Sequence, residues 1–307
     1  MAEVPNPPDE GLMGLQCNLC RQGGPRKLFE REGIWLVQCP KCGLVYTYPF
    51  PAANELKRLY DADYIRGLPG GEGLEADSEW VLDPLSWEAA RMRYATAGVR
   101  GKRLLEVGCA TGQFLAALKQ QGWEVWGVEF NGQAAAAAAR RLSARVLGGD
   151  FMGANLPEEY FDTVTLFHVI EHVLDPRQTV QKIRSVLRKN GRLVLETPDI
   201  GSRRARKLGP RWPSVKPGEH LYYFDQNSLH NLLESAGFRV DKVRRCGGLG
   251  MLTQAQRPGA AHVAKHTAFE FRHWLAPTPW LRSLARRLYW DFLRQNECLL
   301  LVASRRS

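Results

Sequence analysis

The segment LLEVGCATGQF, residues 104–114, constrains the fold of this chain more than any other feature. An apolar strand leads into a turn with glycines at Gly108 and Gly112, and a helix starts directly behind the turn. Glycine lets a backbone approach a ligand closely because it has no Cβ, and free N–H groups at a helix start attract an anionic group. Glu129 ends a second strand, 124–130, where its carboxylate can accept hydrogen bonds from both hydroxyls of a ribose. This order predicts a nucleoside-binding half-site at the carboxyl edge of a parallel sheet.

The spacing within the turn distinguishes between two nucleoside ligands. A dinucleotide fingerprint requires G-x-G-x-x-G, but Ala110 and Gln113 occupy the second and third glycine positions counted from Gly108. The spacing E-x-G-x-x-x-G, from Glu106 to Gly112, instead resembles motif I of class I S-adenosylmethionine-dependent methyltransferases. The resemblance implies an α/β fold with a doubly wound, mostly parallel seven-stranded sheet, and it implies S-adenosylmethionine as the cofactor.

Further segments continue this resemblance in the order that the family has. Residues 161–176 resemble its fourth strand and substrate-facing loop, and residues 187–198 resemble its helix-to-fifth-strand turn. Asp150 and Phe151 fall where the family contacts the adenine. The cofactor-binding residues that we expect from the resemblance are Glu106, Gly108, Cys109, Ala110, Gly112, Glu129, Phe130, Asp150, Phe151 and His168.

Four cysteines near the N-terminus predict a structural zinc site. They form two C-x-x-C pairs, Cys17 with Cys20 and Cys39 with Cys42. Two such pairs can place four thiolates around one Zn²⁺, and the metal then replaces the core that so short a segment cannot build. Disulfides or free thiols are the alternative, which a reducing compartment disfavours. The remaining cysteines, Cys109, Cys246 and Cys298, are expected to be buried apolar residues rather than nucleophiles.

The pattern along the chain predicts four segments. Residues 1–14 form a disordered lead-in, 15–50 a zinc ribbon, 51–100 a helical linker or lid, and 101–307 the methyltransferase domain, which carries a helical insertion at 258–296. Alternating strands and helices after residue 101 favour the doubly wound sheet. We expect a helix from Asp175 to Asn190, and strands at 192–197 and 238–246. The last strand, 297–306, should insert antiparallel by analogy with the family.

Composition limits the partners and the compartment. Hydrophobic residues make up 44% of the chain and charged residues 24%, which are globular values. No apolar run reaches the roughly 20 residues of a membrane span, and the proline-rich start does not resemble a signal peptide, so we expect a cytoplasmic protein. The net charge of +10 permits nucleic-acid binding, although charge runs are usually solvated faces. Residues 278–294 form either a lid or a basic amphipathic helix that contacts a lipid surface or a lipid-linked substrate.

Histidines supply the expected chemistry. Methyl transfer is an in-line displacement that depends on alignment, and a hydroxyl nucleophile also needs a base, for which histidine is suited near neutral pH. The ribbon, the segment CGLVYTYPFP and the segment EHLYYF together resemble zinc-ribbon methyltransferases of sugar and natural-product pathways. In related enzymes a histidine of the EH segment lies at the substrate, which implies His220 as the base. His172 and Tyr222 complete the expected catalytic set.

The sequence is compatible with three functions. The favoured one is O-methylation of a small molecule or saccharide. The second is methylation of rRNA or tRNA, with the ribbon and the basic clusters holding RNA; against it, the fourth strand ends in FHVIEH rather than in a D/N-P-P-Y/F motif. The third is a non-catalytic scaffold that binds the cofactor as a signal.

Overall fold

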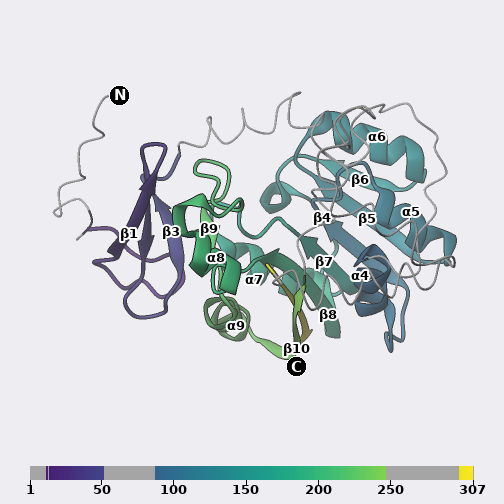
Figure 1. The fold of residues 1–307 in the computed structure, drawn as a ribbon. Coiled ribbons are helices and arrows are strands. Elements are labelled where there is room, and N and C mark those ends of the chain that lie inside the picture. Colours follow the sequence, from purple (N-terminus) through teal and green to yellow (C-terminus); the bar gives the residue numbers. More distant parts are fainter. Residues whose placement is uncertain (1–11, 13, 52–86, 247–296, 307) are drawn as a thin grey trace, which may run out of the picture.

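The computed structural model describes residues 12, 14–51, 87–246 and 297–306, which form two β-sheets with helices packed around them (Figure 1). The larger sheet has seven strands in the order β10-β11-β8-β7-β4-β5-β6. Its strands are β4 (Arg103–Val107), β5 (Glu124–Glu129), β6 (Arg145–Gly148), β7 (Phe161–Phe167), β8 (Leu187–Pro198), β10 (Phe238–Cys246) and β11 (Cys298–Arg305).

Pairing within the larger sheet confirms the expected doubly wound architecture. Strand β4 pairs in parallel with β5 and β7, and β7 pairs in parallel with β8. Strand β11 lies antiparallel to both β8 and β10, as predicted for the last strand. The described helices are α4 (Trp87–Thr96), α5 (Gln113–Gln120), α6 (Gly132–Leu142), α7 (Pro176–Val186), α8 (Arg203–Leu208) and α9 (Gln226–Ser235).

Alternation along the central strands builds a core on each face of this sheet. Successive side chains of a strand point to opposite faces, so Leu104 packs with α4, α5 and α6 whereas Leu105 packs with α7 and α9. The neighbours Leu300 and Leu301 divide between the same two cores. Both faces of the sheet are therefore buried, and the ends of the strands are where a ligand can bind.

The boundary between α7 and β8 differs from the prediction. The expected helix runs from Asp175 to Asn190, but α7 ends at Val186 and β8 begins at Leu187. Leu187 is fully buried and pairs with Phe161, so the chain from Leu187 onward belongs to the sheet and not to the helix. Asn190 adopts a φ of 59°, a left-handed conformation that cannot continue an α-helix.

The smaller sheet joins the N-terminal segment to a strand from late in the chain. It contains β1 (Arg26–Arg31), β2 (Ile34–Gln38), β3 (Val45–Tyr48) and β9 (Tyr222–Tyr223), in the order β1-β2-β3-β9. Strand β3 pairs antiparallel with β9, and Figure 1 shows β9 between β3 and the larger sheet. The ribbon cysteines Cys17 and Cys39 share one core with Leu221 and Tyr222.

Several predicted features lie outside the described residues. They are most of the lead-in 1–14, most of the linker 51–100 and the insertion 258–296 with its amphipathic stretch 278–294. Within the described part of the chain, no helix combines the length and the apolar character that crossing a membrane requires.

Candidate active site

The turn between β4 and α5 has the geometry that the sequence predicts. Gly108 and Gly112 adopt φ values of 74° and 77°, and Ala110 lies between them at 48°. A Cβ on Gly108 would stand 2.4 Å from Cγ2 of Val169, so only glycine allows the loop after β7 to lie this close to the turn. The turn thus meets the loop after β7 directly.

Glu129 lies against this turn. One of its carboxylate oxygens, Oε2, accepts a hydrogen bond from the backbone N–H of Ala110 at 2.8 Å, and Oε1 accepts one from the N–H of Asn131 at 3.0 Å. Burial raises the pKa of Glu129, and these amide donors oppose that shift. The acid and the glycine turn, which lie on different strands, therefore form one site at the carboxyl edge of the sheet.

Glu106 places a second acid beneath the turn. Its side chain is buried, and among the described residues its Oε2 has no hydrogen-bond partner. Burial raises the pKa of Glu106 to about 8, although the charge of Arg91 acts in the opposite direction. An unsatisfied buried carboxyl is costly by itself and is suited to a ligand that brings an N–H donor. This oxygen, the glycine turn and Glu129 offer the acceptors and backbone groups that a nucleoside with an amino-acid portion can bind.

The expected adenine contacts lie beyond Glu129. The backbone N–H of Gly149 donates to the carbonyl of Glu129 at 2.8 Å, which ties the ends of β5 and β6 together. Asp150 caps the short 3₁₀ turn Phe151–Gly153 by accepting from the N–H of Met152 at 3.1 Å. Phe151 is buried, whereas 41% of Phe130 is exposed. Contact of these residues with an adenine stays a prediction.

His168 lies within a network of buried charges. Its Nε2 is 3.1 Å from Oε1 of Glu196 and its Nδ1 is 3.4 Å from Oε1 of Glu171. Burial would lower the pKa of His168, but the two carboxylates outweigh it and raise the pKa to about 10. The ring is therefore an imidazolium at neutral pH. Its predicted contact with the cofactor is not tested by these interactions.

Two further histidines meet edge to face beside this network. The ring centroids of His172 and His220 are 4.7 Å apart, and each ring offers a nitrogen within 4.8 Å of a Glu171 carboxylate oxygen. His172 Nδ1 lies 2.8 Å from the carbonyl oxygen of Glu219, and it must donate there because a carbonyl only accepts. Nδ1 of His220 is buried and has no partner among the described residues.

Burial lowers the pKa of His220 to about 3, and the neighbouring His172 adds to this shift. The ring is therefore neutral at pH 7 and keeps a lone pair. Thr197 helps to hold the nearby carboxylate, because its hydroxyl donates to Oε2 of Glu171 at 3.0 Å. The arrangement provides a neutral imidazole beside His172 and Glu171.

Tyr222 faces the ribbon. Its hydroxyl donates to the carbonyl of Leu174 at 2.9 Å and accepts a hydrogen bond from the side-chain amide of Asn18. Tyr222 follows His220 by two residues, but its hydroxyl is directed toward the N-terminal segment. A role for this hydroxyl in chemistry stays a prediction.

An ion pair that the sequence does not predict joins Arg91 to Glu196. Arg91 donates to both carboxylate oxygens of Glu196, at 2.7 and 2.8 Å, and Trp87 adds a third donor at 2.8 Å. Helix α4 is thereby fixed to the carboxyl end of β8. One signal was present: like Glu129, Glu196 is an acid at the end of an apolar strand, in the segment LVLETP.

The four ribbon cysteines converge as the spacing predicts. Their sulfurs all lie within 4.8 Å of one another, with Sγ–Sγ distances of 3.5 Å between Cys17 and Cys42 and 3.4 Å between Cys20 and Cys39. Four sulfurs at about 2.3 Å from one tetrahedral ion would be separated by about 3.8 Å. The thiol of Cys42 lowers the pKa of Cys17 to about 5 despite burial, and the N–H groups of Cys20 and Leu19 contribute. The cluster is compatible with a structural Zn²⁺.

Comparison with known proteins places the described site within a family. The sequence profile of the family described as "Methyltransferase domain" matches residues 83–243. A tRNA U34 carboxymethyltransferase of Methylococcus capsulatus is 29% identical over 61% of this chain and 59% of its own length. A ubiquinone biosynthesis O-methyltransferase of Pseudomonas aeruginosa is 30% identical over 33% of this chain and 46% of its own length. The chain thus spans about half the length of these relatives.

Solved structures show the same fold. A complex between the Haloferax volcanii Trm112 methyltransferase activator and a methyltransferase contains a chain that aligns with a TM-score of 0.54 and 16% identity. The alignment covers 84% of this chain and all of that chain. At this identity, the likeness concerns the architecture alone.

Proposed function

The chain belongs to the methyltransferase domain family, and from this premise we propose that it transfers a methyl group from S-adenosylmethionine to a hydroxyl of a small molecule or saccharide. The observation that carries the proposal is the contact between Glu129 and the amide of Ala110 at 2.8 Å, since it joins the acid and the glycine turn into one nucleoside site. S-adenosylmethionine, when bound, supplies a methyl group on a sulfonium, which is already activated for displacement.

The cofactor would be held by residues at the ends of three neighbouring strands, β4, β5 and β6. Glu129 would accept from the ribose hydroxyls, the turn from Gly108 to Gly112 would lie against the amino-acid portion, and Glu106 would accept from its ammonium. Asp150 and Phe151 would contact the adenine. A buried acid that already has protein donors needs no reorganisation when the ligand arrives, so this half of the site is preorganised.

His220 is proposed as the base that takes the acceptor proton. Its neutral ring and unpartnered Nδ1 support this role, because a base must hold an available lone pair at the working pH. A pKa of about 3 makes it a weak base, so the proton should leave together with methyl transfer rather than before it. His172 is proposed beside it, with its ring oriented by the carbonyl of Glu219.

The test follows formation of S-adenosylhomocysteine with panels of phenols and hydroxylated saccharides. We expect turnover with at least one acceptor, and we expect His220→Asn to abolish it while S-adenosylhomocysteine affinity is retained. His230→Asn on α9, where 45% of the side chain is exposed, is the matched control. Equal turnover in wild type and His220→Asn would remove His220 from the mechanism.

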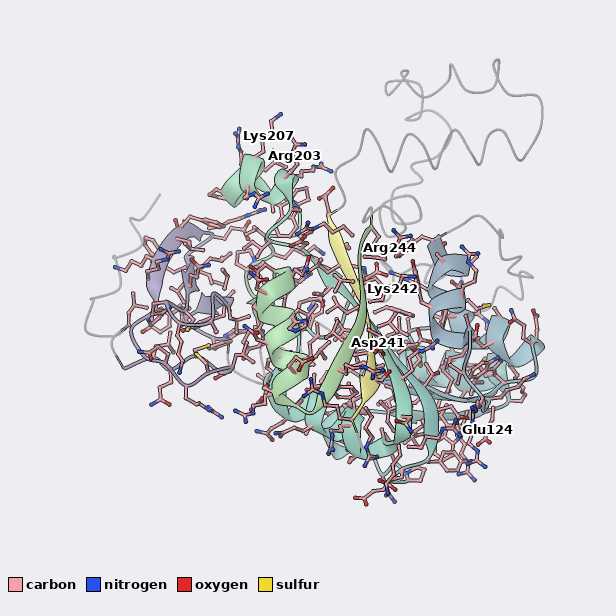
Figure 2. All side chains as sticks on the ribbon, turned by 90° about the horizontal axis from the view of Figure 1, so that it is seen from below. Glu124, Arg203, Lys207, Asp241, Lys242 and Arg244 are labelled. Atoms are coloured by element: carbon pink, nitrogen blue, oxygen red, sulfur yellow. The ribbon has the colours of Figure 1, made fainter. Side chains whose placement is uncertain are left out.

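RNA methylation is the second candidate, and two observations favour it. One of the similar proteins is a tRNA U34 carboxymethyltransferase. In addition, α8 and the 3₁₀ turn that follows it expose four basic side chains, those of Arg203, Arg206, Lys207 and Arg211. Figure 2 shows Arg203 and Lys207 on the outer surface of the molecule. Retention of tRNA that weakens steeply with salt, together with methyl transfer to it, would favour this candidate over the small-molecule acceptor.

The third candidate is a protein that binds the cofactor without turnover. The intact set of Glu106, Gly108, Gly112, Glu129 and Asp150 supports binding but not catalysis. Measured methyl transfer that His220→Asn abolishes would exclude this candidate. Tight cofactor binding with no transfer to phenols, saccharides or tRNA would support it.

A further inference from the structure

We infer that the four-cysteine ribbon positions strand β9 and, through it, His220 two residues earlier in the chain, so that metal occupancy of the ribbon controls the acceptor half of the site and leaves the cofactor half intact. Asn18 and Tyr222 are the positioning residues in this coupling. Its catalytic consequence rests on the proposed function, whereas the mechanical coupling can be measured without any acceptor.

One of the two edges of strand β9 is paired with a strand of the ribbon. Strand β9 has two residues, and its partner strand in the sheet is β3. The pairing continues one residue earlier, where the N–H of Thr47 donates to the carbonyl of Leu221 at 3.0 Å and the Thr47 side chain is fully buried. So short a strand has little stability of its own. An unfolded ribbon would leave the Leu221 carbonyl without this donor.

The other edge of the strand is held by the loop after β7. The N–H groups of Leu221 and Tyr222 both donate to the carbonyl of Glu171, at 2.8 and 3.1 Å. The segment that begins with His220 is therefore clamped between the ribbon on one side and the His168–His172 loop on the other. Loss of one side of the clamp releases His220 from its place beside His172.

A side-chain contact reinforces the backbone pairing. Asn18 lies between Cys17 and Cys20, and its amide donates to the hydroxyl of Tyr222. The ring of Phe50, at the end of the ribbon, lies 5.7 Å from the ring of Tyr222 and 6.1 Å from that of Tyr46. Because Asn18 belongs to the first cysteine pair, its position depends on the geometry of the metal centre.

The cofactor half is built from other contacts. Ala110 and Asn131 hold Glu129 through bonds made within β4, β5 and the turns that follow them. The ribbon bonds instead to β9 and, through Arg31, to the carbonyl of Pro210 at 3.0 Å. Removing the metal should therefore change the two halves of the site unequally.

The first experiment compares amide hydrogen exchange in the full-length protein loaded with Zn²⁺, stripped by a chelator and reloaded. On stripping, we expect the amides of Leu221 and Tyr222 to exchange at least about tenfold faster, while those of β4 and β7 stay protected. Affinity for S-adenosylhomocysteine should change by less than about twofold, and reloading should restore protection. Unchanged exchange at Leu221 and Tyr222 in the stripped protein would overturn the coupling.

The second experiment leaves the metal in place and uses a double-mutant cycle. Asn18→Ala removes the bond to Tyr222, whereas Tyr222→Phe removes both that bond and the one to the Leu174 carbonyl. We therefore expect Tyr222→Phe to reduce kcat at least as much as Asn18→Ala does, and the double variant to lose no more than Tyr222→Phe alone. The acceptor KM should change less than kcat, because His220 is misplaced while the pocket remains. Additive losses, or a loss in Tyr222→Phe with none in Asn18→Ala, would overturn the positioning role of the bond between Asn18 and Tyr222.

Tyr160→Phe is the matched control for the cycle. Its hydroxyl donates to Glu124 at 2.6 Å on an exposed part of the larger sheet, and its removal should leave kcat unchanged. If no acceptor is methylated by any variant, the proposed function fails, yet hydrogen exchange still decides the coupling. If turnover occurs and exchange does not respond to Zn²⁺, the coupling fails and the proposed function stands.

Discussion

Glu129 accepts hydrogen bonds from Ala110 and Asn131 at both of its carboxylate oxygens, and a bound ribose must share those oxygens. We predict that Glu129→Ala weakens binding of S-adenosylhomocysteine by about 1–3 kcal/mol, because charge-assisted bonds are lost and buried amides lose their acceptor. Titration calorimetry measures the change. Glu129→Gln keeps the size of the side chain but not its charge. Its affinity for S-adenosylhomocysteine should lie between those of the wild type and Glu129→Ala. Wild-type affinity in Glu129→Ala would reject the assignment.

At His220, the direction of the pKa shift predicts an unusual pH profile. A base acts in its unprotonated form, and a pKa lowered to about 3 keeps that form present well below neutral pH. We therefore expect kcat/KM to change little from pH 7 to pH 5. A histidine with the ordinary pKa of about 6.5 would lose roughly thirtyfold over the acid limb. A fall centred near pH 6.5 would contradict the buried, neutral state of the ring.

Sequence reasoning found the residues whose type and local spacing carry the signal. Four cysteines in two pairs, two glycines in one turn and an acid at a strand end are each readable from a few neighbouring positions. The ion pair of Arg91 and Glu196 was not found, because its partners lie far apart in the chain and meet only when α4 packs on β8. The direction of the Tyr222 hydroxyl was likewise set by Asn18, a distant residue.

The turn between β4 and α5 provides a prediction at the scale of an element. Gly108→Ala places a Cβ 2.4 Å from Val169 at a φ of 74°. A left-handed conformation costs an L residue about 1–2 kcal/mol, and crowding adds about 1–3 kcal/mol. We expect a lower urea midpoint together with loss of cofactor binding. Gly153→Ala, whose Cβ would meet nothing within 4 Å, is the control. Wild-type stability in Gly108→Ala would show that the loop after β7 is not held against the turn.

The ribbon gives a second prediction at this scale. Cys39→Ser should lose one equivalent of zinc and unfold the segment from β1 to β3, since the metal supplies the folding energy of such small units. Metal analysis and circular dichroism measure both effects. The larger sheet should remain folded, and Cys246→Ser, at a buried cysteine outside the cluster, should retain the metal. Full metal retention in Cys39→Ser would contradict four-thiolate coordination.

Elements with a strong local pattern were predicted to within one or two residues. The strands Phe238–Cys246 and Cys298–Arg305 follow the ranges expected at 238–246 and 297–306. The end of α7 was placed too late, because burial of Leu187 in the sheet outweighs the turn signal at Asn190 and Gly191. Strand β9 was not predicted at all: two residues carry no periodicity, and their pairing depends on β3, far away in the sequence.

At the scale of the whole molecule, cofactor binding and ribbon folding should be separable in a thermal experiment. A ligand present at one hundred times its Kd stabilises the native state by about 2.7 kcal/mol, which corresponds to a rise in Tm of roughly 5–10 °C for a domain of this size. We expect S-adenosylhomocysteine to produce this rise in Zn²⁺-loaded protein and also after chelation. Loss of the rise on chelation would mean that the ribbon supports the cofactor half as well.

The register of the last two strands has a consequence for the length of the chain between them. Cys246, at the end of β10, lies directly opposite Cys298, at the start of β11. The chain therefore leaves the sheet and re-enters it at adjacent points, as in an ordinary hairpin. The number of residues inserted at this junction can therefore vary without altering the pairing of β10 with β11.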